Sequence, residues 1–189
     1  MLSPVRTSAP ATTPITLTEA KAHLRVGHTA EDTLIGIYID AATATLDGWT
    51  GILGRCMVTQ TWRQDFDGFY DDMRLPFPDV QSVTVAYYDS TNTSQTLSGS
   101  VYTLVNDAGG ARIELAYNQT FPATYDRLDA VRVTLVAGYG AASAVPAALK
   151  AAMLLHVGVM FTARGDADGS GELPPAYHAL VAPYRVVGV

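Results

Sequence analysis

A nearly continuous apolar stretch near the end of the chain limits the folds that this sequence can adopt. Residues 133–164 read VTLVAGYGAASAVPAALKAAMLLHVGVMFTAR, which predicts a strand, a Gly-Tyr-Gly turn, a short loop and a long helix. Pro146 suits the first helical position, where its missing N–H costs nothing, and Gly165 is placed to end the helix. Because apolar residues lie on nearly every side of this helix, we expect its own domain or neighbouring subunits to enclose it.

Two apolar stripes run along the helix at helical spacing. The first stripe is expected to pack on an earlier helix, and the second either completes the same core or faces a neighbouring subunit. Lys150 and His156 interrupt the apolar run before it reaches the roughly 20 residues of a membrane span, so no membrane is expected as a partner. The first stripe contains Ala148, Ala152, Leu155 and Val159, and the second contains Leu149, Met153, His156 and Met160.

Two shorter helices are predicted near the N-terminus, after residues 1–14, which are rich in Ser, Thr, Ala and Pro and are expected to form a flexible arm. Thr16 and Glu19 have the spacing of a capping box, and Gly27 is placed to end the first helix. Thr29 is the expected N-cap of the second helix. The apolar stripe of the second helix contains Ile35, Ile39, Ala42, Leu46 and Trp49.

The middle of the chain, residues 57–140, has the composition of an antiparallel β region. Short runs of Val, Thr, Tyr and Phe alternate with Asp, Asn, Gly and Pro. The sequence therefore predicts an α+β fold, in which this β insertion interrupts a helical core formed by residues 15–56 and 141–165. Residues 166–189 are expected to form a flexible linker and a partner-binding tail. The predicted strands are VTQTWRQDF, VQSVTVAYYD, VYTLV, ARIEL and AVRVTLV.

Composition excludes some classes of function. The chain carries 12 Lys and Arg residues against 18 Asp and Glu residues, a formal net charge of −6. Nonspecific binding to nucleic acid depends on neutralising phosphates, so it is not expected here. The single cysteine, Cys56, excludes an intramolecular disulfide.

No motif predicts a catalytic residue, a cofactor or a metal. The four histidines lack a two-ligand metal spacing, and neither a nucleophile elbow nor a phosphate loop occurs. Residues 166–172 imitate the first half of an EF-hand loop, but Tyr177 stands where the bidentate Glu is needed. An acidic linker is the better interpretation of this segment.

Aromatic residues mark one possible contact surface in the β region. Residues 65–72 mix carboxylates with Phe69 and Tyr70, and exposed aromatic residues are typical of protein interfaces. A solvated hairpin tip is the alternative interpretation. The residues that we predict for a subunit interface are Leu149, Met153, His156, Met160, Phe69 and Tyr70.

Five segments, in this order and spacing, resemble the head–tail connector (adaptor) proteins of tailed bacteriophages and phage-derived gene-transfer agents. They are LTEAKAHLRVGHTAEDTLIGIYIDAATATLDGWTG, QTWR, LPFPDVQSVTVAYYD, VTLVAGYG and VPAALKAAMLLHV, and the resemblance covers about residues 15–165. It implies a helical core with a β insertion and no enzymatic activity. It also implies a ring of roughly a dozen copies between the portal protein and a tail-side connector or stopper. DNA would pass through the central channel without specific binding.

The resemblance also implies a location: the protein is expected in a virion or phage-like particle that assembles in the bacterial cytoplasm. The tail lies beyond the segments that carry the resemblance, and our own hypothesis is that it reaches the portal. Another minor virion component, such as a stopper or tail-completion protein, is the alternative; a monomeric hydrolase or carbohydrate-binding domain is less favoured. The predicted portal-binding residues are Pro174, Pro175, Tyr177, Leu180, Tyr184, Arg185, Val187 and Val189.

Overall fold

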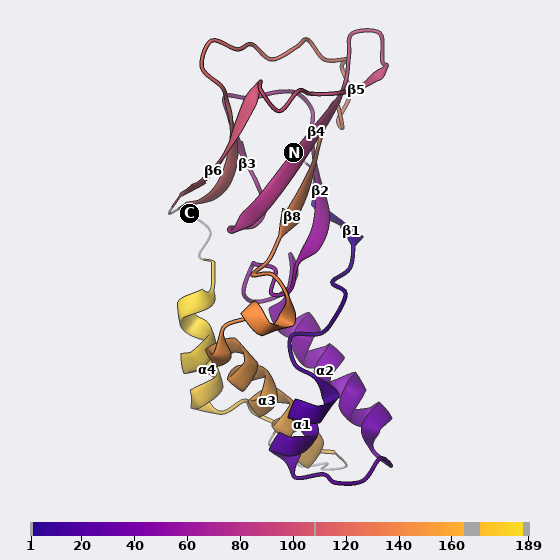
Figure 1. The fold of residues 1–189 in the computed structure, drawn as a ribbon, viewed down its shortest axis with the longest axis vertical. Coiled ribbons are helices and arrows are strands. Elements are labelled where there is room, and N and C mark those ends of the chain that lie inside the picture. Colours follow the sequence, from indigo (N-terminus) through magenta and orange to yellow (C-terminus); the bar gives the residue numbers. More distant parts are fainter. Residues whose placement is uncertain (1, 108, 165–170, 187–189) are drawn as a thin grey trace. The chain divides into compact units, whose positions relative to one another are not determined.

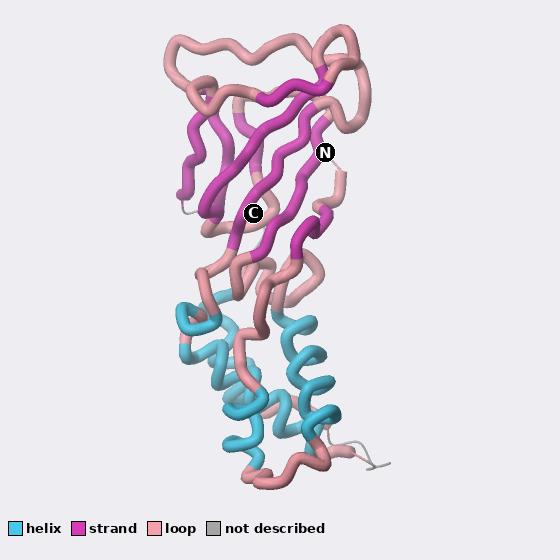
Figure 2. Tube along the Cα trace, turned by 45° about the vertical axis from the view of Figure 1, so that its right-hand side comes forward, coloured by secondary structure: helices cyan, strands magenta, loops and turns pink. Residues whose placement is uncertain are grey.

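The computed structural model describes residues 2–107, 109–164 and 171–186 of the 189-residue chain. Within these residues it contains four α-helices and two antiparallel β-sheets (Figures 1 and 2), which confirms the predicted α+β class. The described chain divides into two compact units. Residues 12–58 and 139–186 form the helical unit, and residues 2–11 and 59–138 form the β unit.

The helical unit contains α1 (Leu17–Leu24), α2 (Asp32–Leu46), α3 (Ala147–Thr162) and α4 (Pro175–Val181), with 3-10 turns at Ala142–Ala144 and Ala182–Tyr184. The predicted capping box is present at the start of α1. The Glu19 N–H donates to the Thr16 hydroxyl at 3.1 Å, and the Thr16 N–H donates to the Glu19 carboxylate at 2.6 Å. This reciprocal pair satisfies two backbone donors that the first helical turn leaves free.

Two helix ends differ from the prediction. α1 ends at Arg25, not at Gly27, because Arg25 itself adopts the left-handed conformation (φ 58°) and its N–H donates to the Ala22 carbonyl. α2 begins after Glu31, whose side chain makes no capping hydrogen bond, so the predicted N-cap Thr29 does not cap this helix. Trp49 lies beyond the end of α2 and is exposed, so it does not continue the buried stripe.

One apolar core holds the helical unit together. Its central members on α2 are the predicted stripe residues Ile35, Ile39, Ala42 and Leu46. On α3 the buried residues are Leu149, Ala152, Met153 and Val157. Of the two alternatives for the second predicted stripe, the structure shows the first: Leu149 and Met153 complete the core. The first stripe contributes Ala152, while its Leu155 and Val159 are only partly buried. Both faces of α3 are apolar, so periodicity alone does not distinguish them.

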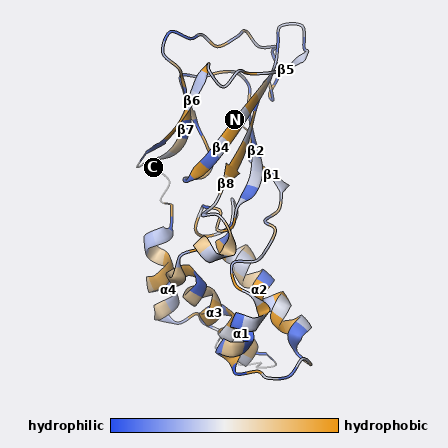
Figure 3. Ribbon diagram, in the orientation of Figure 1, coloured by the Kyte–Doolittle hydropathy of each residue, from blue (hydrophilic) through white to orange (hydrophobic). Residues whose placement is uncertain are grey.

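The β unit contains a five-stranded and a three-stranded sheet. The first has the order β1 (Val5–Ser8), β2 (Gln60–Phe66), β8 (Val131–Ala137), β4 (Val80–Tyr88), β5 (Ser94–Thr96). The second has the order β3 (Asp72–Arg74), β7 (Gly110–Leu115), β6 (Tyr102–Asp107). All pairings are antiparallel. Alternate residues of the central β8 are buried, as half-buried strands require, and β8 is coloured toward the hydrophobic end of the scale in Figure 3.

Three short strands were not among the predicted elements. Residues 5–8, which lie in the segment expected to be a flexible arm, form β1 and pair with β2, with Val5 opposite Arg63. Every side chain of β1 is exposed, so its pairing depends on backbone hydrogen bonds that leave no apolar pattern in the sequence. The other two, β3 and β5, have three residues each.

Candidate interaction surfaces

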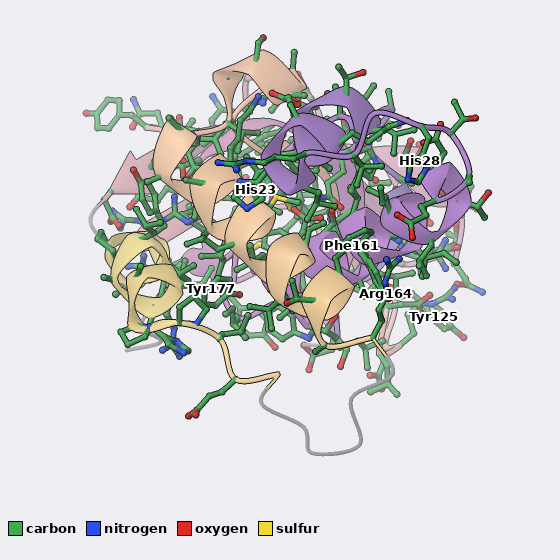
Figure 4. The ribbon with its side chains drawn as sticks, turned by 90° about the horizontal axis from the view of Figure 1, so that it is seen from below. His23, His28, Tyr125, Phe161, Arg164 and Tyr177 are labelled. Carbon is green, nitrogen blue, oxygen red and sulfur yellow. The ribbon has the colours of Figure 1, made fainter. Side chains whose placement is uncertain are left out.

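The described part of the C-terminal tail packs on its own helical unit. Tyr177, labelled in Figure 4, is 1% exposed and Val181 is also buried. The Tyr177 ring meets the His156 ring of α3 edge-on, with centroids 5.6 Å apart. Farther along, the Val186 N–H donates to the Leu53 carbonyl at 2.8 Å. Gly54 lies in the left-handed region (φ 62°), and a Cβ there would come 3.3 Å from the Val186 Cβ. The tail therefore completes the helical core up to this point.

The predicted portal-binding residues fall into different environments. Tyr177 belongs to the core, so we withdraw it as a portal anchor. Pro175 and Arg185 are exposed, and Pro174, Leu180 and Tyr184 are partly buried. Val187 and Val189 lie outside the described residues, as does most of the acidic segment 166–172.

The predicted interface residues also separate. Leu149 and Met153 are fully buried inside the helical unit, so they have no surface to offer to a neighbouring subunit. His156 and Met160 are partly exposed. In the β unit, Phe69 is partly exposed and stacks on the Phe121 ring with centroids 4.5 Å apart, so part of its surface is already covered.

Tyr70 is the exposed member of this predicted set in the β unit. Its side chain is about half exposed, and its hydroxyl donates to the Asp67 carboxylate at 2.9 Å. This hydrogen bond lowers the pKa of Asp67 and raises the pKa of Tyr70. The pair holds an exposed aromatic ring in one orientation beside a carboxylate.

Two polar atoms are buried where α3 meets α4. Neither the His156 Nδ1 nor the Tyr177 hydroxyl has a hydrogen-bond partner among the described residues. Burial lowers the pKa of His156 and raises the pKa of Tyr177, so both side chains are neutral at pH 7. An unsatisfied buried polar group destabilises the folded state, and this contact is therefore held by ring packing.

A groove lies between α1 and α3. It has a volume of about 410 Å³ and is lined by residues of α1 and α3 and by Pro174, which precedes α4. The residues from the two helices are His23, Leu24, Leu155, Gly158, Val159, Phe161 and Thr162. Figure 4 shows His23 beside α3. A Cβ at position 158 would lie 3.3 Å from the His23 Nε2, so the glycine permits this close approach. The groove uses Leu155 and Val159 of the first predicted stripe, which the core covers only in part, and the sequence alone did not reveal this site.

A charged cluster fixes the loop that precedes β8. The Asp129 carboxylate accepts hydrogen bonds from Arg127 at 2.5 Å and from Arg132 at 2.5 Å. Both guanidinium groups lie over the Tyr88 ring of β4, at 3.8 and 4.9 Å from its centroid. Such stacking is favourable between a cation and an aromatic face. Hydrogen bonds from Arg127 and then Arg132 lower the pKa of Asp129 to about 2.

We expect Asp129→Asn to lower the melting temperature of the β unit by about 2–4 °C at pH 7. A folded-state pKa that is depressed from 3.8 to about 2 stabilises the fold above pH 4, and this contribution is lost as the pH falls through 2. The difference in melting temperature between wild type and variant should therefore shrink between pH 4 and pH 2. Asp126→Asn, at an exposed neighbouring carboxylate, is the matched control. A difference that stays constant with pH would contradict an electrostatic role.

Metal and membrane sites are not found in the described structure. No group of three or more His, Cys, Asp or Glu residues in the described ranges is arranged to hold a metal ion. None of the described helices is long and apolar enough to cross a membrane. The described surfaces include the apolar groove between α1 and α3 and the charged cluster around Asp129.

Comparison with known proteins agrees with this. Residues 14–107 match the family of Phage gp6-like head-tail connector proteins. No curated protein matches the chain. Among solved structures, a chain in the neck of an empty GTA particle computed with C6 symmetry is 25% identical, with a TM-score of 0.80 over 100% of this chain and 97% of that chain.

Two further structures share the fold. A chain in the virion of a native gene transfer agent (GTA) particle is 24% identical with a TM-score of 0.80, and one in the neck of a native GTA particle computed with C12 symmetry is 22% identical with a TM-score of 0.74. Each match covers 100% of this chain and 97% of the other chain. The family consists of structural connectors and not of enzymes. With the family match and the full-length likeness, the chain belongs to the gp6-like head–tail connector proteins.

Proposed function

We propose that this connector forms a ring in the neck of a gene-transfer-agent or phage-like particle, between the portal and a tail-side connector or stopper. The observation that carries the proposal is the full-length likeness to a chain in a GTA neck, with a TM-score of 0.80 at 25% identity. The C6 and C12 symmetries of the necks that contain similar chains support a cyclic assembly. Roughly a dozen copies would enclose the DNA channel.

The charge of the chain fits a channel protein. A net charge of −6 disfavours binding to the DNA backbone, so DNA would pass without specific contacts. The particle would assemble in the bacterial cytoplasm. Its two protein partners would meet different surfaces of the ring, one on the portal side and one on the tail side.

The end of the tail is the proposed contact with the portal. Arg185 is exposed and follows the last 3-10 turn, Ala182–Tyr184. Because Tyr177 is occupied in the core, the contact would use Pro175 and Arg185, the exposed parts of Leu180 and Tyr184, and the residues that follow. His156, Met160 and Tyr70 remain proposed contacts between subunits or with neighbouring proteins, since each exposes part of its side chain.

Deleting residues 185–189 is expected to abolish attachment to the portal while the protein stays folded. The deletion removes the Val186–Leu53 hydrogen bond, worth about 1 kcal/mol, and leaves Tyr177 and Val181 in place. Mass photometry of the protein mixed with its portal measures attachment and ring formation, and a melting curve checks the fold. Deleting all of residues 171–189 would not test the portal contact, because it also removes the core residues Tyr177 and Val181. If the protein that lacks residues 185–189 binds the portal normally, the tail is not the portal contact. If the wild-type protein stays monomeric when it is mixed with the portal, the ring proposal is wrong.

A further inference from the structure

An apolar face on α2 is left unused by the fold of the helical unit. Ile37 is 58% exposed, and the residues that share its face at helical spacing, Thr33, Ala41 and Ala44, are also exposed. These three neighbours are small and uncharged, and the exposed Asp40 borders the same face one turn after Ile37. The face therefore presents one large branched side chain that projects above a shallow surround.

The groove between α1 and α3 has the complementary form. It is concave, and most of its lining is apolar, with Leu155, Val159 and Phe161 among its walls. Its volume of about 410 Å³ accommodates a branched aliphatic side chain. An exposed apolar groove of this kind is typical of a protein contact site.

The two surfaces point away from each other. Ile37 lies two residues from both Ile35 and Ile39, on the side of α2 opposite to its buried stripe. Leu155, Gly158 and Thr162 lie on the side of α3 opposite to its buried residues Leu149 and Met153. Since α2 and α3 pack against each other through their buried sides, the α2 face and the groove cannot meet within one copy.

Charges beside the two surfaces are also complementary. Asp40 is exposed one turn after Ile37, and Arg25 is exposed directly after the groove residue Leu24. Neither forms an ion pair or a side-chain hydrogen bond within the described parts of the chain. By contrast, Lys21 pairs with Asp32, and Lys150 lies 3.7 Å from the Glu19 carboxylate.

We propose that Ile37 of one copy inserts into the α1–α3 groove of a second copy, and that Asp40 of the first copy pairs with Arg25 of the second. The proposal rests on the ring function proposed above and names the surfaces that join its subunits. A contact between two different surfaces of the same chain is heterologous, and repetition of such a contact closes a ring when the rotation permits. The exposed parts of Leu155 and Val159 are then covered in the assembly.

The first test is Ile37→Asp, with Ile52→Asp as the matched control at another exposed isoleucine of the helical unit. With the portal present, Ile37→Asp should lower the ring yield by at least about tenfold, as loss of a central apolar anchor does, while Ile52→Asp rings form normally. Melting curves of both variants should match wild type because both positions are exposed. If the Ile37→Asp variant forms rings as well as the wild type does, this inference is overturned, while the proposed ring function still holds. Failure of the wild type to form rings would instead overturn the proposed function.

The second test depends on the two surfaces being different. Arg25→Asp and Asp40→Arg should each reduce ring yield, and the double variant should restore it.

A mixing experiment tests the same point with two variants. Subunits with Ile37→Asp keep an intact groove, whereas subunits with Leu155→Glu keep an intact Ile37. In a mixture of these two, chemical cross-linking should capture heterodimers and no larger species, with cross-links mapping to α2 of one copy and to α1 or α3 of the other. Cross-links from the portal into the groove would overturn the assignment.

Discussion

Met153→Asp is expected to unfold the helical unit. Met153 has no exposed surface and lies in the core with Leu149 and Val157. Loss of a buried methionine side chain costs about 2–5 kcal/mol, and burial of an unpaired carboxylate adds a further penalty. Together these approach the whole stability of about 5–15 kcal/mol that a domain has. Urea unfolding followed by circular dichroism should show loss of helical signal without denaturant or at a much lower urea concentration.

Met153→Leu is the matched control for this result. The change keeps the volume and the apolar character of the side chain, so it should cost less than about 1.5 kcal/mol. A Met153→Asp protein that melts like wild type and fails only in ring assembly would show that Met153 faces a neighbouring subunit. That outcome would contradict the core position and restore the interface role that the sequence first suggested.

The parts of the fold that the sequence predicts well are those in which one local signal decides the structure. Thr16 and Glu19 form their capping box from contacts three residues apart. The strand β8 shows period-two burial because each side chain alternates between two faces. The stripe of α2 predicts its buried face because polar residues such as Asp40 occupy the other side.

The parts that sequence reasoning misses depend on which partner an element finds. α3 is apolar on two faces, so its orientation is decided by the shape of α2 and α4 and not by its own pattern. β1 has no buried side chain and is held by backbone pairing to β2. The groove and the cluster around Asp129 arise from residues far apart in sequence, such as Leu24 with Leu155 and Tyr88 with Arg132. No short-range spacing marks the groove, and the local spacing of Arg127, Asp129 and Arg132 does not show that Tyr88 lies beneath the two guanidinium groups.

Tyr177→Ala is expected to detach α4 from α3. The Tyr177 ring is 1% exposed and packs against His156, and truncation of a buried aromatic side chain costs about 3–5 kcal/mol. α4 has only seven residues, too few to be stable as an isolated helix. Hydrogen exchange at the α4 amides should therefore become fast, while amides of α2 keep most of their protection. Unchanged protection of α4 in this variant would contradict a core position for the ring.

Tyr177→Phe separates the ring from its hydroxyl. The hydroxyl is buried without a hydrogen-bond partner in the described structure, so it bears the desolvation penalty of a polar group and gains no bond in return. Its removal should leave stability unchanged or raise it by about 1 kcal/mol, and α4 should remain protected. The contrast between the two variants assigns the α3–α4 contact to apolar packing. If Tyr177→Phe instead destabilises α4 as strongly as Tyr177→Ala, the hydroxyl has a bonded partner, and the contact is polar.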